Sequence, residues 1–306
     1  MSVWMCSGQG AQKPGMGTDL LDLPQVADTF TVLSKELGID VALLAKDGTP
    51  EEVNGAVAAQ ALTMAVSVGV GRVLQDAGIR PDAIIGFSLG QISALVLAGV
   101  LSLEDAARLL KVRATAMDAA CQKNPGGMVA LMGASVEEAR ALCEAQAQGG
   151  VLVPANMNCP GQVVISGTPD ALDRASAAWK DAGKKAVKLA TAGAFHSPLM
   201  ADAAQEVETF CASLDFAEPQ VTLLCNTDAR PFVAAEAAAR LGAQVCSGVM
   251  FQQSVEALIA QGETDFVEVG FGGVLVNLVK RIDRGTTRAA LGTREQLDAY
   301  MAEHGA

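Results

Sequence analysis

Short apolar runs alternate with longer amphipathic segments along the 306-residue chain. The runs at 2–6 and 82–87 end at glycine-rich or polar turns, which predicts short buried strands. A 3.6-residue apolar period predicts helices at 60–78, 89–99 and about 104–121. Further strands are predicted at 221–226 and 265–270, and further helices to about 214, near 234–247, and at 251–262 and 274–282. The alternation predicts a layered α/β protein with a mostly parallel sheet.

The order of the predicted elements changes between residues 125 and 191. Helices are predicted at 135–147 and 168–183, interleaved with strands at 127–133, 150–157, 162–167 and 184–190. This β-α-β-β-α-β order is that of the ferredoxin-like unit. We therefore expect a small ferredoxin-like subdomain, 125–191, inserted into a large α/β-hydrolase-like subdomain formed by 1–124 and 192–306.

Composition narrows the class of protein. Half of the residues are apolar and 18% are charged, as in soluble globular proteins, and the net charge of 22 − 34 = −12 disfavours nucleic acid as a partner. Seven scattered cysteines without a C-x-x-C pair predict neither a disulfide framework nor a zinc site and fit a reducing cytoplasm. No signal peptide is predicted, and the longest apolar stretch, 92–101, is too short to span a bilayer.

A G-x-S-x-G pattern at 86–90 places Ser88 between a predicted strand and a predicted helix. This is the sharp turn on which the motif exposes a nucleophile. A serine attacks an acyl group only if a base takes its proton, and histidine is the usual base. The chain has two histidines, and His304 lies near the C-terminus, where chains usually fray. The expected base is therefore His196.

The sequence leaves open which group orients His196. Three aspartates between the serine and the histidine are candidates, but they fall in the small subdomain: Asp170, Asp173 and Asp181. A backbone carbonyl can hold the imidazole tautomer instead. The oxyanion hole needs backbone N–H donors. Leu89 lies at a helix start, where N–H groups are free, and Gln9 lies in a glycine-rich turn that lets the backbone approach closely. That turn matches neither the dinucleotide-binding pattern nor the P-loop pattern.

Arg113 lies on the apolar face of the helix predicted at about 104–121. By the i, i+3, i+4 rule it shares this face with Leu109, Leu110 and Met117, while the charged residues share the other face. A buried arginine needs a partner. Arg113 therefore either extends its guanidinium to the edge of the stripe or serves a binding site.

Six features occur in an order and spacing that resemble the malonyl-CoA:acyl carrier protein transacylases over nearly the whole chain: SGQGAQKPGMG, GFSLGQISAL, Arg113, ANMNCPGQVVISG, AFHSPLM and EVGFGGVL. The resemblance implies the two-subdomain fold described above. It implies that Ser88 accepts the acyl group, that His196 is its base and that Arg113 binds the malonyl carboxylate. Gln9 and Leu89 match the oxyanion-hole positions.

The resemblance also implies finer roles. The main-chain carbonyl that holds the histidine in this family falls at Met250, and Asn156 and Gln162 lie in a segment near the site. Phe195 resembles the malonyl-selective version of the family, in which the ring crowds an α-methyl group. The chain departs from the family at Gln91, where an acid is customary, at Gly248, where a proline is customary, and at Phe271-Gly272-Gly273. We expect these changes to affect carrier or CoA contacts more than chemistry.

The resemblance implies a ping-pong transfer of malonyl from CoA to Ser88 and then to the phosphopantetheine thiol of acyl carrier protein, which supplies fatty acid synthesis. It implies a cytoplasmic monomer that needs no cofactor, metal or membrane partner. An acidic carrier would dock on a local basic patch; its candidates are Lys184, Lys185, Lys188, Lys280, Arg281 and Arg284. The alternatives are a serine thioesterase or hydrolase, the transacylase component of a malonate decarboxylase, and a non-catalytic carrier-binding protein.

Overall fold

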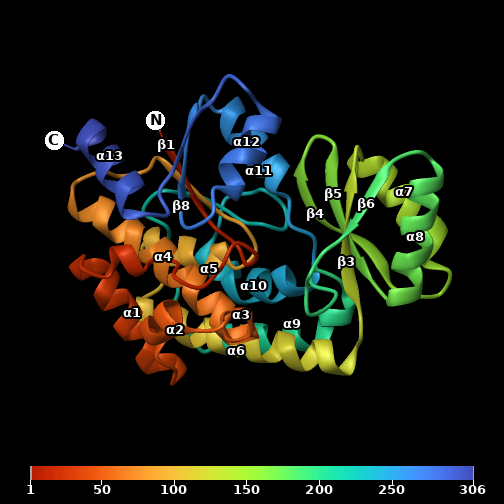
Figure 1. Cartoon of the computed structure of the whole chain (residues 1–306), viewed down its shortest axis with the longest axis horizontal. Coiled ribbons are helices and arrows are strands. Elements are labelled where there is room, and N and C mark those ends of the chain that lie inside the picture. The colour runs from red at the N-terminus through yellow and green to blue at the C-terminus, as the bar shows by residue number, and fades with distance from the viewer. Residues whose placement is uncertain (1, 306) are drawn as a thin grey trace.

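The computed structural model describes residues 2–305, and its strands form two sheets (Figure 1). The larger sheet is parallel throughout, in the order β7-β2-β1-β8-β9; its strands are β1 (Ser2–Cys6), β2 (Ala83–Gly86), β7 (Thr222–Leu224), β8 (Asp265–Val269) and β9 (Thr287–Ala290). The smaller sheet is antiparallel, in the order β4-β5-β3-β6; its strands are β3 (Gly127–Met132), β4 (Leu152–Cys159), β5 (Gln162–Gly167) and β6 (Lys185–Lys188). The predicted fold class, α/β with a ferredoxin-like unit, is confirmed.

The helices divide between the two sheets. The small sheet carries α7 (Val136–Ala147) and α8 (Pro169–Asp181). The others belong with the large sheet: α1 (Pro24–Leu37), α2 (Val41–Asp47), α3 (Pro50–Val53), α4 (Ala56–Asp76), α5 (Gly90–Leu97), α6 (Leu103–Lys123), α9 (Ala201–Cys211), α10 (Ala237–Cys246), α11 (Phe251–Ala260), α12 (Val274–Ile282) and α13 (Arg294–His304). No element is predicted above for 18–53 or 287–304, where the structure has α1 to α3, β9 and α13.

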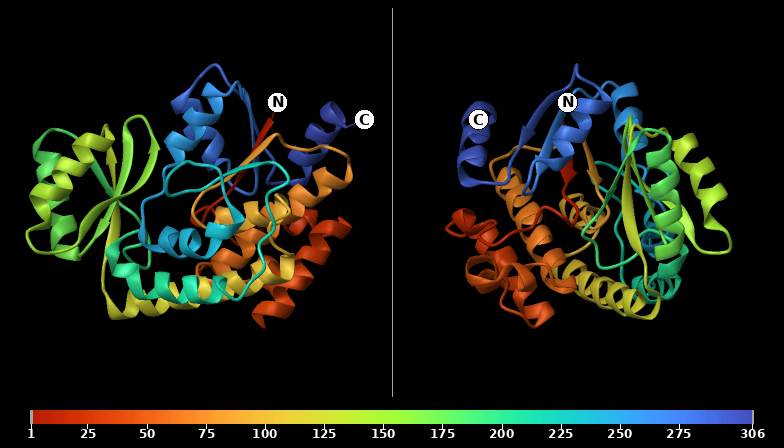
Figure 2. Two further views of the ribbon diagram at one scale, coloured as in Figure 1. Left: turned by 180° about the vertical axis from the view of Figure 1, so that it is seen from behind. Right: turned by 45° about the vertical axis from the view of Figure 1, so that its right-hand side comes forward.

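The two faces of the large sheet are covered by different helices, as both views in Figure 2 show. Along β1, Val3 and Met5 pack with residues of α11 and α12, whereas Trp4 and Cys6 pack with residues of α4, α5 and α6. Successive side chains of a strand point to opposite faces, so a parallel strand covered on both sides is apolar throughout. This accounts for the continuous apolar run at 2–6.

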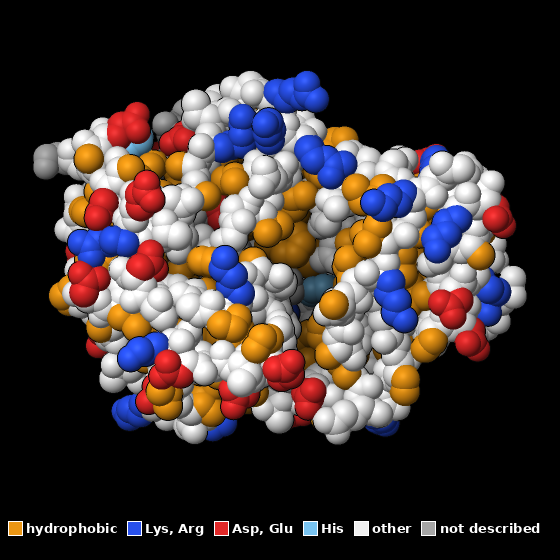
Figure 3. All heavy atoms as spheres, in the orientation of Figure 1, with side chains coloured by type: hydrophobic (Ala, Val, Ile, Leu, Met, Phe, Trp, Pro, Cys, Tyr) orange, Lys and Arg blue, Asp and Glu red, His pale blue; other side chains and the backbone are white. Residues whose placement is uncertain are grey.

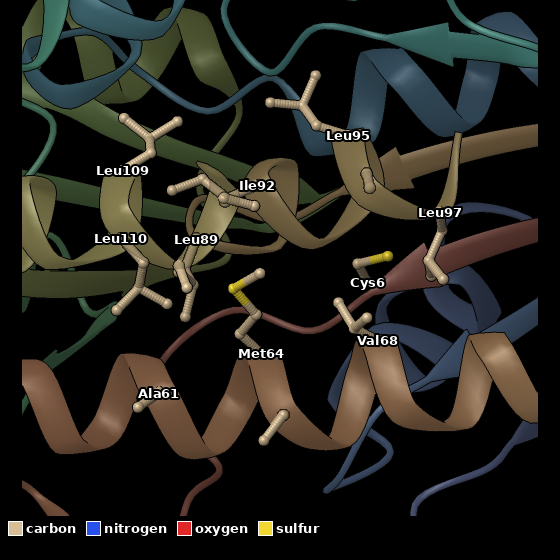
Figure 4. Packing of buried hydrophobic residues seen from close by; sticks show 14 of the residues in the cluster. Cys6, Ala61, Met64, Val68, Leu89, Ile92, Leu95, Leu97, Leu109 and Leu110 are labelled. Carbon is tan, nitrogen blue, oxygen red and sulfur yellow. The ribbon is translucent and has the colours of Figure 1, made fainter. Parts of the chain in front are cut away.

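Helix α4 is the most hydrophobic long helix in the described part of the chain. Its mean hydropathy reaches 1.5 over an 18-residue window, and 83% of that window is buried inside the protein. At 21 residues it is longer than the stretch 92–101, so the expectation that 92–101 is the longest apolar segment is wrong. Met64 faces the side chains of Leu89 and Ile92, and Val68 faces Cys6 (Figure 4). The apolar composition of α4 is thus explained by its packing in the core.

Helices α7 and α8 cover one face of the small sheet, and the other face is turned toward the rest of the molecule. Val129 and Leu131 of β3 pack with residues of α7 and α8. Met128 and Ala130, on the opposite face, pack with Phe195, which follows the small sheet in the chain. This second face forms one wall of the cavity described next.

Candidate active site

Ser88 lies in a tight turn between β2 and α5, with a left-handed backbone conformation at φ 53°. Glycines make this turn possible. A Cβ on Gly90 would collide with the carbonyl oxygen of Cys6, and one on Gly86 would collide with the backbone of Gly90 and Gln91. The G-x-S-x-G spacing is therefore a steric requirement of the elbow, and the predicted position of Ser88 is confirmed.

The serine and the histidine come together across 108 residues of chain. Ser88 Oγ lies 2.8 Å from His196 Nε2. On the other side of the ring, Nδ1 lies 3.0 Å from the carbonyl oxygen of Gln244 and 3.1 Å from that of Ser247. Carbonyl oxygens only accept, so Nδ1 carries the proton and Nε2 accepts the hydroxyl proton of Ser88.

The imidazole is held in its uncharged form. His196 is 3% exposed, and burial, aided by the positive charge of Arg113, lowers its pKa to about 4. At neutral pH the ring is therefore free to take a proton.

The expected role of Met250 is wrong in this structure. Its carbonyl accepts hydrogen bonds from the N–H and the hydroxyl of Ser254, at 3.0 and 2.9 Å, because Met250 is the N-cap of α11. The last turn of α10 leaves its carbonyls without helical partners, and Gln244 and the adjacent Ser247 supply the acceptors instead. Main-chain carbonyls, and not an aspartate, therefore orient His196.

Arg113 is buried, at 2% exposure, on the cavity side of α6. One terminal nitrogen donates to Gln60 Oε1 at 2.8 Å and the other to Ser88 Oγ at 3.1 Å. Its Nε–H has no partner within residues 2–305. Burial lowers the pKa of Arg113 to about 10, so the guanidinium stays charged at neutral pH. A charged fork with unused donors beside the nucleophile suits a carboxylate.

The two expected oxyanion donors flank the elbow. The N–H groups of Gln9 and Leu89 donate to no acceptor in the described part of the chain, whereas the N–H of Ser88 itself donates to Asn226 Oδ1. A Cβ on Gly8 would meet the carbonyl oxygen of Phe87, so glycine lets the turn before Gln9 lie against the elbow. Both donors are available; their use by a substrate stays a prediction.

The site opens into a cavity of about 830 Å³ that contains the side chains of Ser88, His196 and Arg113. The expected pocket residues all line its wall: Phe195, Asn156 and Gln162. Phe271, one of the departures from the family pattern, also lines it, and its ring lies 5.1 Å from the ammonium of Lys13. Figure 3 shows the hollow between the two parts of the molecule, with a histidine inside it and Lys and Arg side chains along part of its rim.

Sequence reasoning missed four buried polar residues: Gln60, Asn226, Gln244 and Glu268. Glu268 accepts hydrogen bonds from Ser7 Oγ at 3.1 Å and from the N–H of Val276 at 3.0 Å, at the start of α12. Burial raises its pKa to about 7. No motif marks Gln60, Asn226 or Gln244, because their partners come from distant segments. Glu268 begins the EVGFGGVL feature, but nothing in that feature indicates that its carboxyl is bound by Ser7 and by the start of α12.

This geometry restricts the chemistry. The serine is poised to accept an acyl group, the neutral imidazole is poised to take its proton, and the adjacent guanidinium favours an acyl group that carries a negative charge. The fold and the site therefore define the class of enzymes that transfer acyl groups through a serine ester.

Comparison with known proteins specifies the family. Residues 3–299 match the family described as the acyl transferase domain. A malonyl CoA-acyl carrier protein transacylase of Salmonella typhimurium is 38% identical over 97% of both chains. The crystal structure of a malonyl-CoA:acyl carrier protein transacylase of Xanthomonas oryzae shares 37% identity and a TM-score of 0.95, covering 100% of this chain and 98% of that one. The chain belongs to the acyl transferase family, among the malonyl-CoA:acyl carrier protein transacylases.

A third relative was solved with a partner. It is a malonyl-transacylase in complex with a type II PKS acyl-carrier protein, 34% identical to this chain with a TM-score of 0.95 and 99% of both chains covered.

Proposed function

We propose that this protein transfers malonyl from malonyl-CoA to the phosphopantetheine thiol of an acyl carrier protein, supplying fatty acid synthesis. The observation that carries the proposal is the buried Arg113 guanidinium, 3.1 Å from Ser88 Oγ. A hydrolase of neutral esters gains nothing from a buried cation beside its nucleophile. A transferase of malonyl groups needs one, because the free carboxylate of malonate must be paired when it leaves water.

The reaction runs in two half-reactions. Ser88 Oγ attacks the thioester carbonyl of malonyl-CoA while His196 Nε2 takes the hydroxyl proton. The carbonyl oxygen becomes an oxyanion facing the N–H groups of Gln9 and Leu89. The C–S bond then breaks, His196 returns the proton to the CoA sulfur, and malonyl remains as an ester on Ser88.

The second half-reaction reverses these steps with another thiol. His196 takes the proton of the carrier's phosphopantetheine thiol, the sulfur attacks the ester carbonyl, and Ser88 leaves with the proton from His196. Arg113 holds the malonyl carboxylate throughout, which keeps the carbonyl near the oxyanion donors. The ring of Phe195 in the wall disfavours an α-methyl group, and one methyl in a pocket is worth about 1–3 kcal/mol. The enzyme should therefore prefer malonyl to methylmalonyl without excluding the latter.

The carrier would approach over the rim of the cavity. Arg281 lines the cavity and donates to the carbonyl oxygens of Pro160 and Gly161 at 3.3 and 3.5 Å. Lys280 and Arg284 are exposed beside it. Across the cavity, Lys185 and Lys188 are exposed on β6, just before the lining segment 189–192. These five cations are our candidates for the surface that meets an acidic carrier.

Lys184 differs from the other candidates. Its ammonium pairs with Glu138 at 2.6 Å and lies 4.2 Å from the Trp179 ring centroid. We therefore omit it from the proposed surface. A monomeric state and a cytoplasmic location stay predictions.

A transfer assay tests the function. Malonyl-CoA is mixed with the enzyme and a phosphopantetheinylated acyl carrier protein, and the mass of the carrier is followed. We expect a malonyl adduct on the carrier with the wild type, and none with Ser88→Ala or with a carrier that lacks the phosphopantetheine arm. Steady CoA release without carrier would instead indicate the hydrolase. Loading of a malonate decarboxylase carrier in preference to the fatty acid carrier would indicate that alternative.

A further inference from the structure

The peptide groups of Ser88 are held by two side-chain amides. The Ser88 N–H donates to Asn226 Oδ1 at 2.6 Å, and the Ser88 carbonyl oxygen accepts from Gln244 Nε2 at 2.6 Å. Ser88 is one of four non-glycine residues with positive φ within 2–305. Such a conformation persists only where the surroundings determine it. The two amides hold Ser88 from both sides, together with the Gln91 N–H, which donates to the same Ser88 carbonyl oxygen at 3.0 Å.

Gln244 also holds the other member of the dyad. Its main-chain carbonyl accepts from His196 Nδ1 at 3.0 Å, while its side chain donates to the Ser88 carbonyl. It can do both because it lies in the last turn of α10, where a carbonyl is free of the helix. A single residue therefore contacts both the serine backbone and the imidazole ring.

The amides can adopt only one orientation. The Ser88 N–H is a donor, so Asn226 must present its oxygen, and its Nδ2 then points to the Gly86 carbonyl and to Gln91 Oε1, the latter at 2.8 Å. Gln91 Oε1 also accepts from the Asn226 N–H at 3.1 Å. Since the Ser88 carbonyl is an acceptor, Gln244 must present its nitrogen. Asn226, Gln91 and Gln244 are all at most 4% exposed, so water cannot replace these bonds.

We propose that Gln244, with Asn226 as its partner, is a positioning residue that sets the 2.8 Å distance between Ser88 Oγ and His196 Nε2. The proposal rests on the proposed function only in its choice of substrate. Catalysis through a positioned dyad is sensitive to displacements of about 1 Å, which cost on the order of 100-fold in rate. Gln244 is not among the residues that line the cavity in which the substrate would bind, so its loss should act on the rate and not on binding.

Two variants and a control test this. Gln244→Met removes the side-chain donor, and Gln244→Glu replaces the amide with a carboxyl group of nearly the same shape, which donates only when it is protonated. Both variants keep the main-chain carbonyl. The control is Gln205→Glu, the same change at an exposed position of the neighbouring helix α9. The rate of malonyl-Ser88 formation is measured by rapid quench and intact mass, per folded molecule, over a range of malonyl-CoA concentrations.

We expect Gln244→Met to lower the maximal acylation rate by about 100-fold, with the half-saturating malonyl-CoA concentration within about twofold of the wild type. Burial raises the pKa of the carboxyl in Gln244→Glu. Above that pKa the ionised group only accepts, so the rate should fall by a similar factor; below it the protonated carboxyl donates to the Ser88 carbonyl, so the rate should recover. A change in folding alone would move neither the rate per folded molecule nor its dependence on pH. Gln205→Glu should match the wild type.

A second readout separates this proposal from the proposed function. Inactivation by a fluorophosphonate depends on the nucleophilicity of Ser88 and needs no malonyl group. If the wild type reacts with the fluorophosphonate but forms no malonyl ester, the proposed function fails and the positioning role is judged from the inactivation rates alone. A rate per folded molecule within threefold of the wild type for Gln244→Met would overturn the positioning role. A loss confined to malonyl-CoA binding would overturn it as well.

Discussion

Replacing Arg113 with methionine should separate charged from neutral acyl groups. Methionine keeps a long unbranched side chain inside α6 and removes only the guanidinium, so it leaves a smaller void than alanine would. Malonyl-CoA then loses the partner of its carboxylate. The reaction with acetyl-CoA, which has no carboxylate, loses only the hydrogen bond that Arg113 donates to Ser88 Oγ.

The size of the effect follows from the burial of Arg113, which is 2% exposed and has an unpaired Nε–H. Removing one partner of a buried, hydrogen-bonded charge pair costs about 2–5 kcal/mol. At about 1.4 kcal/mol per tenfold, kcat/KM for malonyl transfer should fall by about 30- to 4,000-fold. The acetyl reaction should change by less than about tenfold, because removing the cation raises the pKa of His196 toward its usual value and makes it a stronger base.

The assay is intact-protein mass spectrometry after brief mixing with malonyl-CoA or acetyl-CoA, which reads the acyl-Ser88 adduct directly. Arg108→Met is the matched control: Arg108 lies on the same helix, with its side chain 50% exposed, and pairs with Asp105 at 2.7 Å. A surface pair of this kind contributes at most about 1 kcal/mol, so both adducts should form as in the wild type.

One outcome would refute the reasoning. If Arg113→Met lowers malonyl and acetyl adducts by the same factor, Arg113 acts on the nucleophile or on folding and does not recognise the carboxylate. Loss of the adduct in Arg108→Met would equally show that helix α6, and not the guanidinium, is responsible.

Three further predictions follow from the buried groups. Because burial lowers the pKa of His196 to about 4, kcat/KM should stay level as the pH falls from 8 to about 5 and decline only near 4; a decline centred at 6.5 in rapid pH-jump assays would contradict this. The raised pKa of Glu268, about 7 against a usual 4.5, means that its contribution to stability is full below 4.5 and is lost as the pH rises to 7, by up to about 3 kcal/mol. Denaturant titrations of Glu268→Gln should therefore show a flatter dependence of unfolding free energy on pH between 4.5 and 7, and an unchanged slope would count against the assignment. Gly90→Ala places a Cβ against the Cys6 carbonyl, so it should abolish malonyl-Ser88 formation and lower the melting temperature, whereas Gly183→Ala, an open position with φ 74°, should lower only the melting temperature.

The local chemistry of the site could be predicted from the sequence. The elbow glycines, the strand before Ser88 and the helix after it are neighbours in the chain, so their spacing carries the steric requirement directly. Arg113 could be singled out because the helical period places it among apolar residues. His196 could be selected because the chain has only one other histidine, His304, which lies near the C-terminus. In the structure His304 is the last residue of α13 and stacks on Tyr300 at 4.0 Å between ring centroids.

The missed groups have their meaning only in three dimensions. Asn226 and Gln244 lie in unremarkable segments, and the contacts that matter join them to Ser88 across 138 and 156 residues. Met250 was the expected acceptor for His196, but a carbonyl belongs to every residue, so no sequence pattern reports which one points at the imidazole. That choice depends on where α10 ends and α11 begins.

The sequence by itself determined the fold class and singled out Ser88, His196 and Arg113 as site residues. Periodicity and spacing, which act over a few residues, marked Ser88 and Arg113, and elimination left His196. Only the tertiary structure decided which amides and carbonyls hold that dyad. Hydrogen bonds between distant segments are directional and short-ranged, and they are set by how the layers pack. The packing of α10 against the Ser88 elbow is therefore what brings Gln244 into contact with both Ser88 and His196.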